Sequence, residues 1–143
     1  MILTESVYIE HNGNSYCEVL HKGERYIGHA KLHPEDKDKA SRYTGCRFAE
    51  MRAEIKALKA EYKKEKAACE ECRKFVKACT QYKNFDKESP TAKAMFRQLN
   101  QRIKRVNKLA DEINKKLNNL DMAIRQKEIV HNALQKHTQA KND

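Results

Sequence analysis

The sequence predicts an α+β protein, in which a small N-terminal antiparallel β-sheet is followed by two long antiparallel α-helices in a coiled-coil-like hairpin. Turn signals at Asn12-Gly13 and Lys22-Gly23 separate short apolar runs within the first 33 residues. From Phe48 onward, apolar residues recur in alternating steps of three and four, which is the repeat of a helical seam. A break at Ser89-Pro90 divides this repeat into two stretches.

Residues 1–43 are expected to form the sheet and the connector that leaves it. The runs SVYIEH, SYCEVL and RYIGHAKL read as the three strands of a meander, and the polar segment HPEDKDKASRYTG ends the strand region. A sheet this small needs a cover on one face. Its apolar face is expected to include some of Val7, Ile9, Tyr16, Val19, Tyr26, Ile27, Ala30 and Leu32.

Residues 44–143 are expected to form the helical hairpin, with helices of roughly 35 to 40 and about 45 residues. The short link between them requires antiparallel packing, seam against seam. The first seam consists of Phe48, Met51, Ile55, Leu58, Tyr62, Glu65, Cys69, Cys72, Val76 and Cys79. The second seam consists of Ala92, Phe96, Leu99, Ile103, Val106, Ala110, Ile113, Leu117, Leu120, Ile124, Lys127, His131 and Leu134.

Three cysteines form a C-x2-C-x6-C pattern at Cys69, Cys72 and Cys79, which suggests half a zinc site, a redox pair or simple packing. All three stand on seam positions, where a reduced cysteine behaves as a small hydrophobic side chain. A structural zinc site needs four ligands, and no second pair with matching spacing follows. The packing interpretation is therefore favoured, and no metal site is predicted.

The charge of the chain is unevenly distributed. Its net charge of +10 divides into −1 for residues 1–43, +4 for residues 44–90 and +7 for residues 91–143. An anionic partner would therefore be met by the last third of the chain. No membrane partner is expected, because the sequence lacks an apolar run of membrane-spanning length, and its start lacks the features of a signal peptide. A cytosolic protein is the resulting expectation.

A binding function is favoured over catalysis. No nucleophile, phosphate-loop or metal-ligand motif is present, so the protein is expected not to be an enzyme and to need no cofactor. The segment FRQLNQRIKRVNK, residues 96–108, combines cations with amides and a phenyl ring, which suits phosphate and base recognition. The alternative is the solvated face of a purely structural coiled coil. The candidate ligand-binding residues are Phe96, Arg102, Arg105, Asn107 and Arg125.

Several apolar residues fall outside the main seams. A bare helical pair buries one stripe on each helix, so such residues indicate a dimer or a higher oligomer. They are Tyr62, Phe75, Tyr82, Leu109 and Ile129.

The segment YIGHAKLHPEDKDKASRYTGCRFAEMRAEIKALK, residues 26–59, resembles a segment common in small phage proteins. With a sheet before two long helices, the whole layout is similar to the phage Thoeris anti-defence sponge proteins of the first-described type. The resemblance implies a dimeric or hexameric protein of the host cytoplasm that sequesters glycocyclic ADP-ribose without degrading it. Some family members also hold cyclic oligonucleotides, and the family's pocket uses arginines, an asparagine and an aromatic residue of the long helices at a subunit interface.

The predicted function is thus the sequestration of a small, phosphate-bearing cyclic nucleotide as a means of phage immune evasion. The alternative is a basic module that binds nucleic acid or a nucleoprotein, such as an anti-CRISPR protein. The net charge of −1 on the sheet region argues against the sheet as a phosphate-binding surface.

Overall fold

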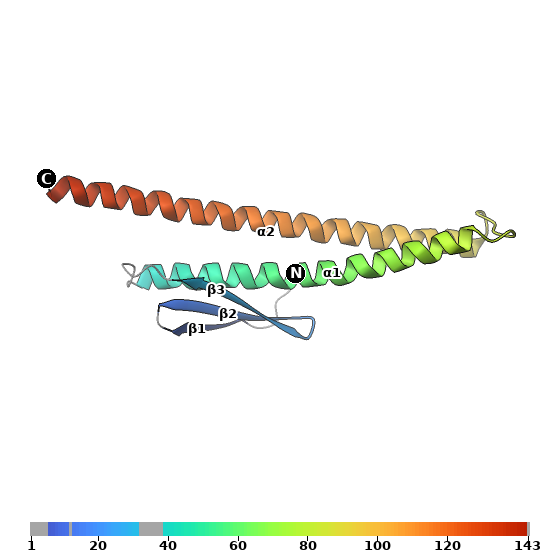
Figure 1. The fold of residues 1–143 in the computed structure, drawn as a ribbon, viewed down its shortest axis with the longest axis horizontal. Coiled ribbons are helices and arrows are strands. Elements are labelled where there is room, and N and C mark those ends of the chain that lie inside the picture. The colour runs from blue at the N-terminus through green and yellow to red at the C-terminus, as the bar shows by residue number, and fades with distance from the viewer. Residues whose placement is uncertain (1–5, 12, 32–38, 143) are drawn as a thin grey trace. The chain divides into compact units, whose positions relative to one another are not determined.

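The computed structural model of the protein describes residues 6–11, 13–31 and 39–142. A three-stranded antiparallel sheet precedes two long helices, which confirms the predicted α+β class (Figure 1). The elements are β1 (Ser6–His11), β2 (Asn14–His21), β3 (Glu24–Lys31), α1 (Lys39–Thr80) and α2 (Pro90–Asn142). The chain divides into two compact units, each containing part of both helices. Unit 1 comprises residues 1–55 and 114–143, and unit 2 comprises residues 56–113.

The sheet of unit 1 is a meander in the order β1-β2-β3, as predicted. His11 pairs with Asn14 across the first turn and His21 pairs with Glu24 across the second. In the second turn Lys22 and Gly23 have φ angles of 50° and 79°, the two positive values that a two-residue type I′ hairpin requires. In the first turn Gly13 has a φ of 77°, whereas Asn12 lies outside the described residues.

The apolar residues of the sheet are divided between its two faces. Val19 and Ala30 are buried, together with Ser15 and Cys17. Ile9 and Ile27, which the sequence also suggested for the apolar face, are 56% and 51% exposed. Their register explains this difference, because both alternate with the buried positions and therefore point to the opposite side of the sheet. Leu32 lies outside the described residues.

The cover of the sheet is the first part of α1, and a glycine allows the close approach. A methyl group at Gly28 of β3 would overlap the carbonyl oxygen of Ala49 and lie 2.5 Å from the backbone nitrogen of Ala53. Ala49 and Ala53 are fully buried, so small residues on both elements bring the strand against the helix backbone. Arg52 then donates a hydrogen bond of 2.6 Å to the carbonyl oxygen of His29.

The predicted start of the first helix is too late. The apolar seam begins at Phe48, but α1 begins at Lys39 and passes through Gly45, the last residue of the predicted polar connector. A methyl group at Gly45 would lie 2.8 Å from the hydroxyl oxygen of Ser15, so this glycine provides room for β2 rather than ending the helix. Residues 33–38 of the predicted connector lie outside the described residues.

The two helices run antiparallel in unit 1, as the short link predicted. Lys116 of α2 donates a 2.9 Å hydrogen bond to the Oε2 atom of Glu54 of α1. Farther along α2, the ammonium group of Lys127 lies 5.6 Å from the centre of the Phe48 ring. Lys127 is a polar residue in the predicted seam, and this cation–π contact accounts for its position there. The side chain of His131, the other such residue in this helix, lies outside the described residues.

In unit 2 the two seams meet in an apolar core. Leu58 packs with Leu109 and Ile113, and the half-buried Tyr62 packs against this cluster. The connection from α1 ends at Ser89, whose hydroxyl accepts a 3.1 Å hydrogen bond from the backbone N–H of Ala92. Ser89 is therefore the predicted N-cap, with Pro90 at the first helical position. In the described part of the chain, neither helix has a segment apolar enough to span a lipid bilayer.

Candidate functional site

The candidate ligand-binding residues all lie on α2 but in different units. Phe96, Arg102, Arg105 and Asn107 belong to unit 2, whereas Arg125 belongs to unit 1. Phe96 and Arg102 are half-buried, and the other three side chains are exposed. The structure thus brings four of the five residues onto one segment of helix.

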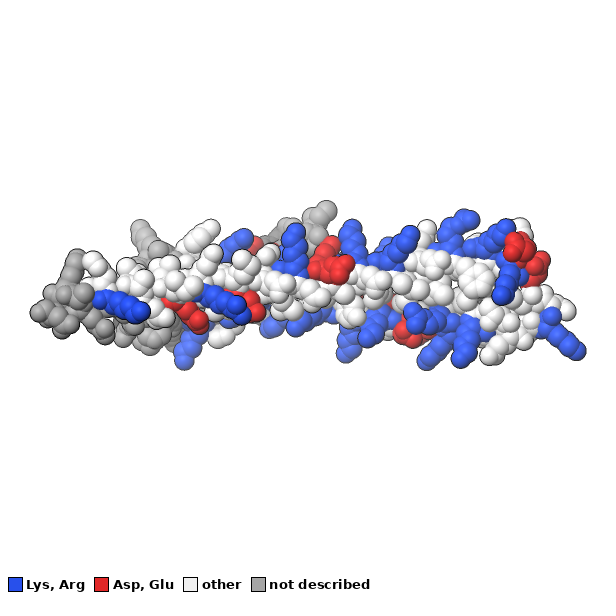
Figure 2. Space-filling view, turned by 90° about the horizontal axis from the view of Figure 1, so that it is seen from above, with Lys and Arg blue, Asp and Glu red and all other residues white. Residues whose placement is uncertain are grey.

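Unit 2 carries most of the positive charge of the chain. Its residues 56–113 include 16 Lys and Arg against 8 Asp and Glu, a net charge of +8 out of the chain's +10. Figure 2 shows Lys and Arg crowded towards the α1–α2 connection, with few acidic residues among them. No Asp or Glu occurs between Ser89 and Ala110, a segment with six cations. These are Lys93, Arg97, Arg102, Lys104, Arg105 and Lys108.

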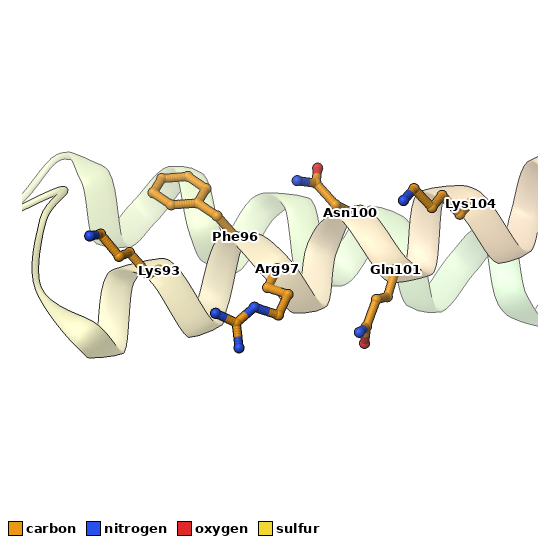
Figure 3. A pocket seen from close by; sticks show the side chains of 6 residues that line it. All are labelled: Lys93, Phe96, Arg97, Asn100, Gln101 and Lys104. Carbon is orange, nitrogen blue, oxygen red and sulfur yellow. The ribbon is translucent and has the colours of Figure 1, made fainter.

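A shallow hollow of about 500 Å³ lies on the N-terminal part of this segment (Figure 3). Its lining residues recur at intervals of one, three and four positions, so they share one side of α2. In Figure 3, Phe96 and Asn100 point to one edge of the hollow and Arg97 and Gln101 to the other. The full lining is Lys93, Phe96, Arg97, Asn100, Gln101 and Lys104. Two aliphatic ammonium groups and one guanidinium group therefore surround a phenyl ring and two amides.

A second hollow of about 180 Å³ continues around the helix from the first. Gln101 lines both hollows, and Gln98, Arg102 and Arg105 complete the second one. Two guanidinium groups with two amides offer only nitrogen donors and amide oxygens, which is a suitable set for a phosphate group. Asn107 lines neither hollow.

The cations of this face differ in how strongly they are engaged within the protein. Arg105 pairs with Glu65 at 3.6 Å, and Lys93 pairs with Glu88 at 3.4 Å. Within the described residues, the side chains of the other four cations make no ion pair or hydrogen bond: Arg97, Arg102, Lys104 and Lys108. These four groups keep their full donor capacity for an anion.

Glu65, the one charged residue in the seam of α1, is explained by this arrangement. Its carboxylate is only 19% exposed and faces the guanidinium of Arg105. Arg105 therefore has a structural partner already, and a phosphate bound to it would compete with Glu65 or share the guanidinium group with it.

The single aromatic ring of the larger hollow is held in place by a second ring. Phe96 packs edge-to-face with Phe85 of the α1–α2 connection, with 6.2 Å between ring centres and an interplanar angle of 82°. This contact holds the half-buried Phe96 at one side of the hollow, where its ring can contact a nucleobase.

The cysteines of the C-x2-C-x6-C pattern lie on α1 in unit 2. Cys69 is buried, and Cys72 and Cys79 are half-buried, as their seam positions suggest. Among the described residues, no group of three or more His, Cys, Asp or Glu side chains is arranged to hold a metal ion.

Two groups under the sheet of unit 1 have shifted pKa values. Burial raises the pKa of the Cys17 thiol to about 11, and the carboxylates of Glu50 and Glu54 add to this effect. Desolvation and a 3.0 Å hydrogen bond donated to Glu50 raise the pKa of the Tyr8 hydroxyl to about 12. Both groups are neutral at ordinary pH, so Cys17 is a packing residue there rather than a reactive thiolate.

No protein-family model, curated protein or solved structure matches the chain. The resemblance to the phage sponge proteins therefore remains an expectation based on the sequence.

Sequence reasoning selected the basic segment but not the residues that line its larger hollow. Only Phe96 of the candidates contributes there, whereas Arg97, Asn100 and Lys104 were not chosen. The spacing of Lys93, Arg97, Asn100 and Lys104, in steps of four, three and four, is the signal for a shared helical side.

Proposed function

We propose that this protein binds phosphate-bearing ligands on the basic face of α2 in unit 2 and that it acts by holding them rather than by converting them. The observation that carries this proposal is a set of four cations that make no ion pair or hydrogen bond among the described residues, on a helical segment without acidic residues: Arg97, Arg102, Lys104 and Lys108. Their charges are not neutralised by neighbouring groups of the same unit. An anion bound there gains charge-assisted hydrogen bonds without displacing an internal ion pair.

The ligand class that we propose first is a cyclic nucleotide-type immune signal, such as glycocyclic ADP-ribose. The hollow of about 500 Å³ falls within the range of roughly 300 to 1,000 Å³ that small-molecule sites occupy. It offers a phenyl ring for a base and cations for phosphates, which are the two chemical parts of such a ligand. Sequestration in the host cytoplasm depends on affinity and protein concentration, so this function requires no catalytic group.

A second candidate is nucleic acid, which the linear arrangement of the cations favours. Lys93 and Lys108 are 15 residues apart, or about 22 Å along a helix at 1.5 Å per residue. About six phosphates of one duplex strand span the same distance at ~3.4 Å per charge. The hollows are also open to solvent, as an extended backbone requires.

Calorimetric titration tests the proposal with glycocyclic ADP-ribose and a 20-base-pair duplex as alternative ligands. Arg102→Gln removes one cation that has no partner within the described residues, so affinity should fall about ten- to hundredfold, the equivalent of 1.5–3 kcal/mol. The control is Lys74→Gln, which removes one charge from an exposed position of α1 in the same unit and should leave the affinity nearly unchanged.

The salt dependence of binding distinguishes the two ligand classes. A duplex held by four cations should show a slope of about −4 in a plot of log affinity against log salt concentration, whereas a small dianion should show a much shallower one. Recovery of the intact cyclic nucleotide after denaturing the complex supports sequestration. Recovery of a cleaved product, or no binding of either ligand at tens of micromolar protein, would refute the proposal.

A further inference from the structure

The part of α2 that belongs to unit 1 carries large apolar side chains on its exposed side. Met122 is 60% exposed, Ile129 is 67% exposed and Val130 is 58% exposed. The small side chain of Ala133 is exposed as well. We call Met122, Ile129, Val130 and Ala133 the outer stripe. Neighbouring exposed apolar residues of this size are typical of an interaction site rather than of an ordinary solvated face.

The outer stripe lies on the side of α2 opposite to the seam with α1. Ile129 follows the buried Leu120 by nine residues, and Ala133 follows the half-buried Ile124 by nine. Nine residues correspond to two and a half turns of an α-helix, which places the members of each pair on opposite sides. Contact with α1 therefore cannot bury the stripe, which leaves it available to a different partner.

The stripe has the spacing of a second helical seam. Three of its members, Met122, Ile129 and Ala133, follow one another in steps of four, three and four once the polar Gln126 between Met122 and Ile129 is counted, and Val130 comes directly after Ile129. This is the repeat with which one helix packs lengthwise against another, so the occupant that fits best is a helix.

The charges beside the stripe show which helix fits. Arg125 and Glu128 lie on the same flank of the stripe, and both are exposed. Among the described residues neither makes an ion pair. When two identical helices pack antiparallel around a two-fold axis, this flank faces the same flank of the other copy. With the axis passing between residues 126 and 127, Arg125 stands opposite the partner subunit's Glu128, and the same pair forms again across the axis.

We propose that the outer stripe is the interface of a two-fold symmetric dimer, in which the α2 helices of two copies pack antiparallel. Met122 of each copy then packs against the partner subunit's Ile129, and the two Arg125–Glu128 pairs flank this contact. A membrane-binding helix would be expected to carry mainly Lys and Arg beside its apolar side, whereas this flank carries charges of both signs in a self-complementary order. The dimer does not depend on the ligand-binding proposal, since the stripe belongs to the other unit.

The mass of the protein in solution, measured by light scattering after gel filtration, tests the interface. The wild-type chain should have the mass of a dimer at tens of micromolar, and Ile129→Glu should be monomeric. Phe75→Glu is the matched control, because Phe75 is 64% exposed on α1 in unit 2 and its replacement should leave the dimer intact. Unchanged helical circular dichroism in both variants will show that the chain remains folded.

Charge reversal tests the proposed pairing. Arg125→Glu and Glu128→Arg each place like charges opposite one another and should raise the dimer dissociation constant about tenfold. The double variant restores both pairs with inverted polarity and should return the constant to the wild-type value. A monomeric wild-type chain, a dimer that survives Ile129→Glu, or a double variant as weak as the single ones would overturn the proposal. Monomers that bind vesicles of anionic lipid through the stripe would likewise overturn it in favour of a membrane surface.

Discussion

Replacing Gly28 with alanine should separate the sheet from α1 in unit 1. A methyl group at this position would overlap the carbonyl oxygen of Ala49 and lie 2.5 Å from the backbone nitrogen of Ala53 and 3.0 Å from the carbonyl carbon of Ala49. All of these atoms belong to helix backbone and cannot rotate away, so the strand itself has to move. Restoring an ordinary separation of 3.4 Å to the nitrogen of Ala53 requires a shift of about 0.9 Å.

The energetic cost of this shift should be large for a small unit. Overpacking a core typically costs about 1–3 kcal/mol, and the contact with backbone atoms puts Gly28→Ala at the upper end of that range. Movement of β3 also loosens the packing around Cys17, which the register places directly opposite Gly28 on β2. If unit 1 opens independently, a loss of 3 kcal/mol corresponds to roughly a hundredfold increase in the population of the open state.

Thiol alkylation followed by peptide mass spectrometry measures this opening. Cys17 is fully buried in unit 1, while Cys69 is 5% exposed in unit 2 and serves as the internal reference. In Gly28→Ala, Cys17 should be labelled roughly a hundredfold faster, with little change at Cys69. Gly23→Ala is the control for the loss of a glycine, because a methyl group there meets no atom within 4 Å. Alanine at its φ of 79° costs only the backbone strain of about 1–2 kcal/mol. Equal labelling of Cys17 in the two variants would refute the steric reasoning.

Two further predictions concern pH and helix capping. Folding raises the pKa of Cys17 from 9.0 to about 11 and the pKa of Tyr8 from 10.0 to about 12. The contribution of these two groups to the unfolding free energy is therefore complete below pH 9 and is lost as the pH rises through these ranges. Cys17→Ala should therefore flatten the decline in unfolding free energy between pH 9 and 11, measured by urea titration, and an unchanged decline would contradict this assignment. Ser89→Ala removes the cap on the N–H of Ala92 and should cost about 1 kcal/mol, whereas Ser89→Asp should retain most of the stability. Equal urea midpoints for the wild type and Ser89→Ala would show that the cap is dispensable.

The elements of the fold were predictable because each has its own spacing of apolar residues and is bounded by turn or cap residues. The alternating steps of three and four gave the seams of both helices, and Lys22-Gly23 gave a hairpin turn whose two positive φ angles the structure confirms. The start of α1 was missed because Gly45 resembles a helix terminator in the sequence. Its actual role depends on Ser15, a residue 30 positions away on β2, and local sequence cannot show such a contact.

The candidate site was predictable as a region but not as a set of partners. The run of cations without acids from Ser89 to Ala110 is visible in the sequence. The partners of these cations are not visible in the sequence. Arg105 pairs with Glu65, whereas Arg102 makes no ion pair among the described residues. This difference depends on how two distant helical segments align. Both arginines are equally good candidates in the sequence. In the structure, Arg102 should contribute more to phosphate binding, because among the described residues no carboxylate shares its donors.

The two proposed surfaces, the basic face and the outer stripe, give different parts of α2 different binding functions. Between Ser89 and Ala110 its exposed side carries cations without acids, whereas from Met122 to Ala133 its exposed side is apolar with charges of both signs beside it. A helix that served only to extend a structural hairpin would need neither feature, since alternating charges would solvate it equally well. If both proposals hold, Arg102→Gln should weaken the ligand and leave the dimer intact, and Ile129→Glu should abolish the dimer. The affinity of Ile129→Glu for the ligand would then decide whether the hollows of one chain are sufficient or whether the second copy completes them.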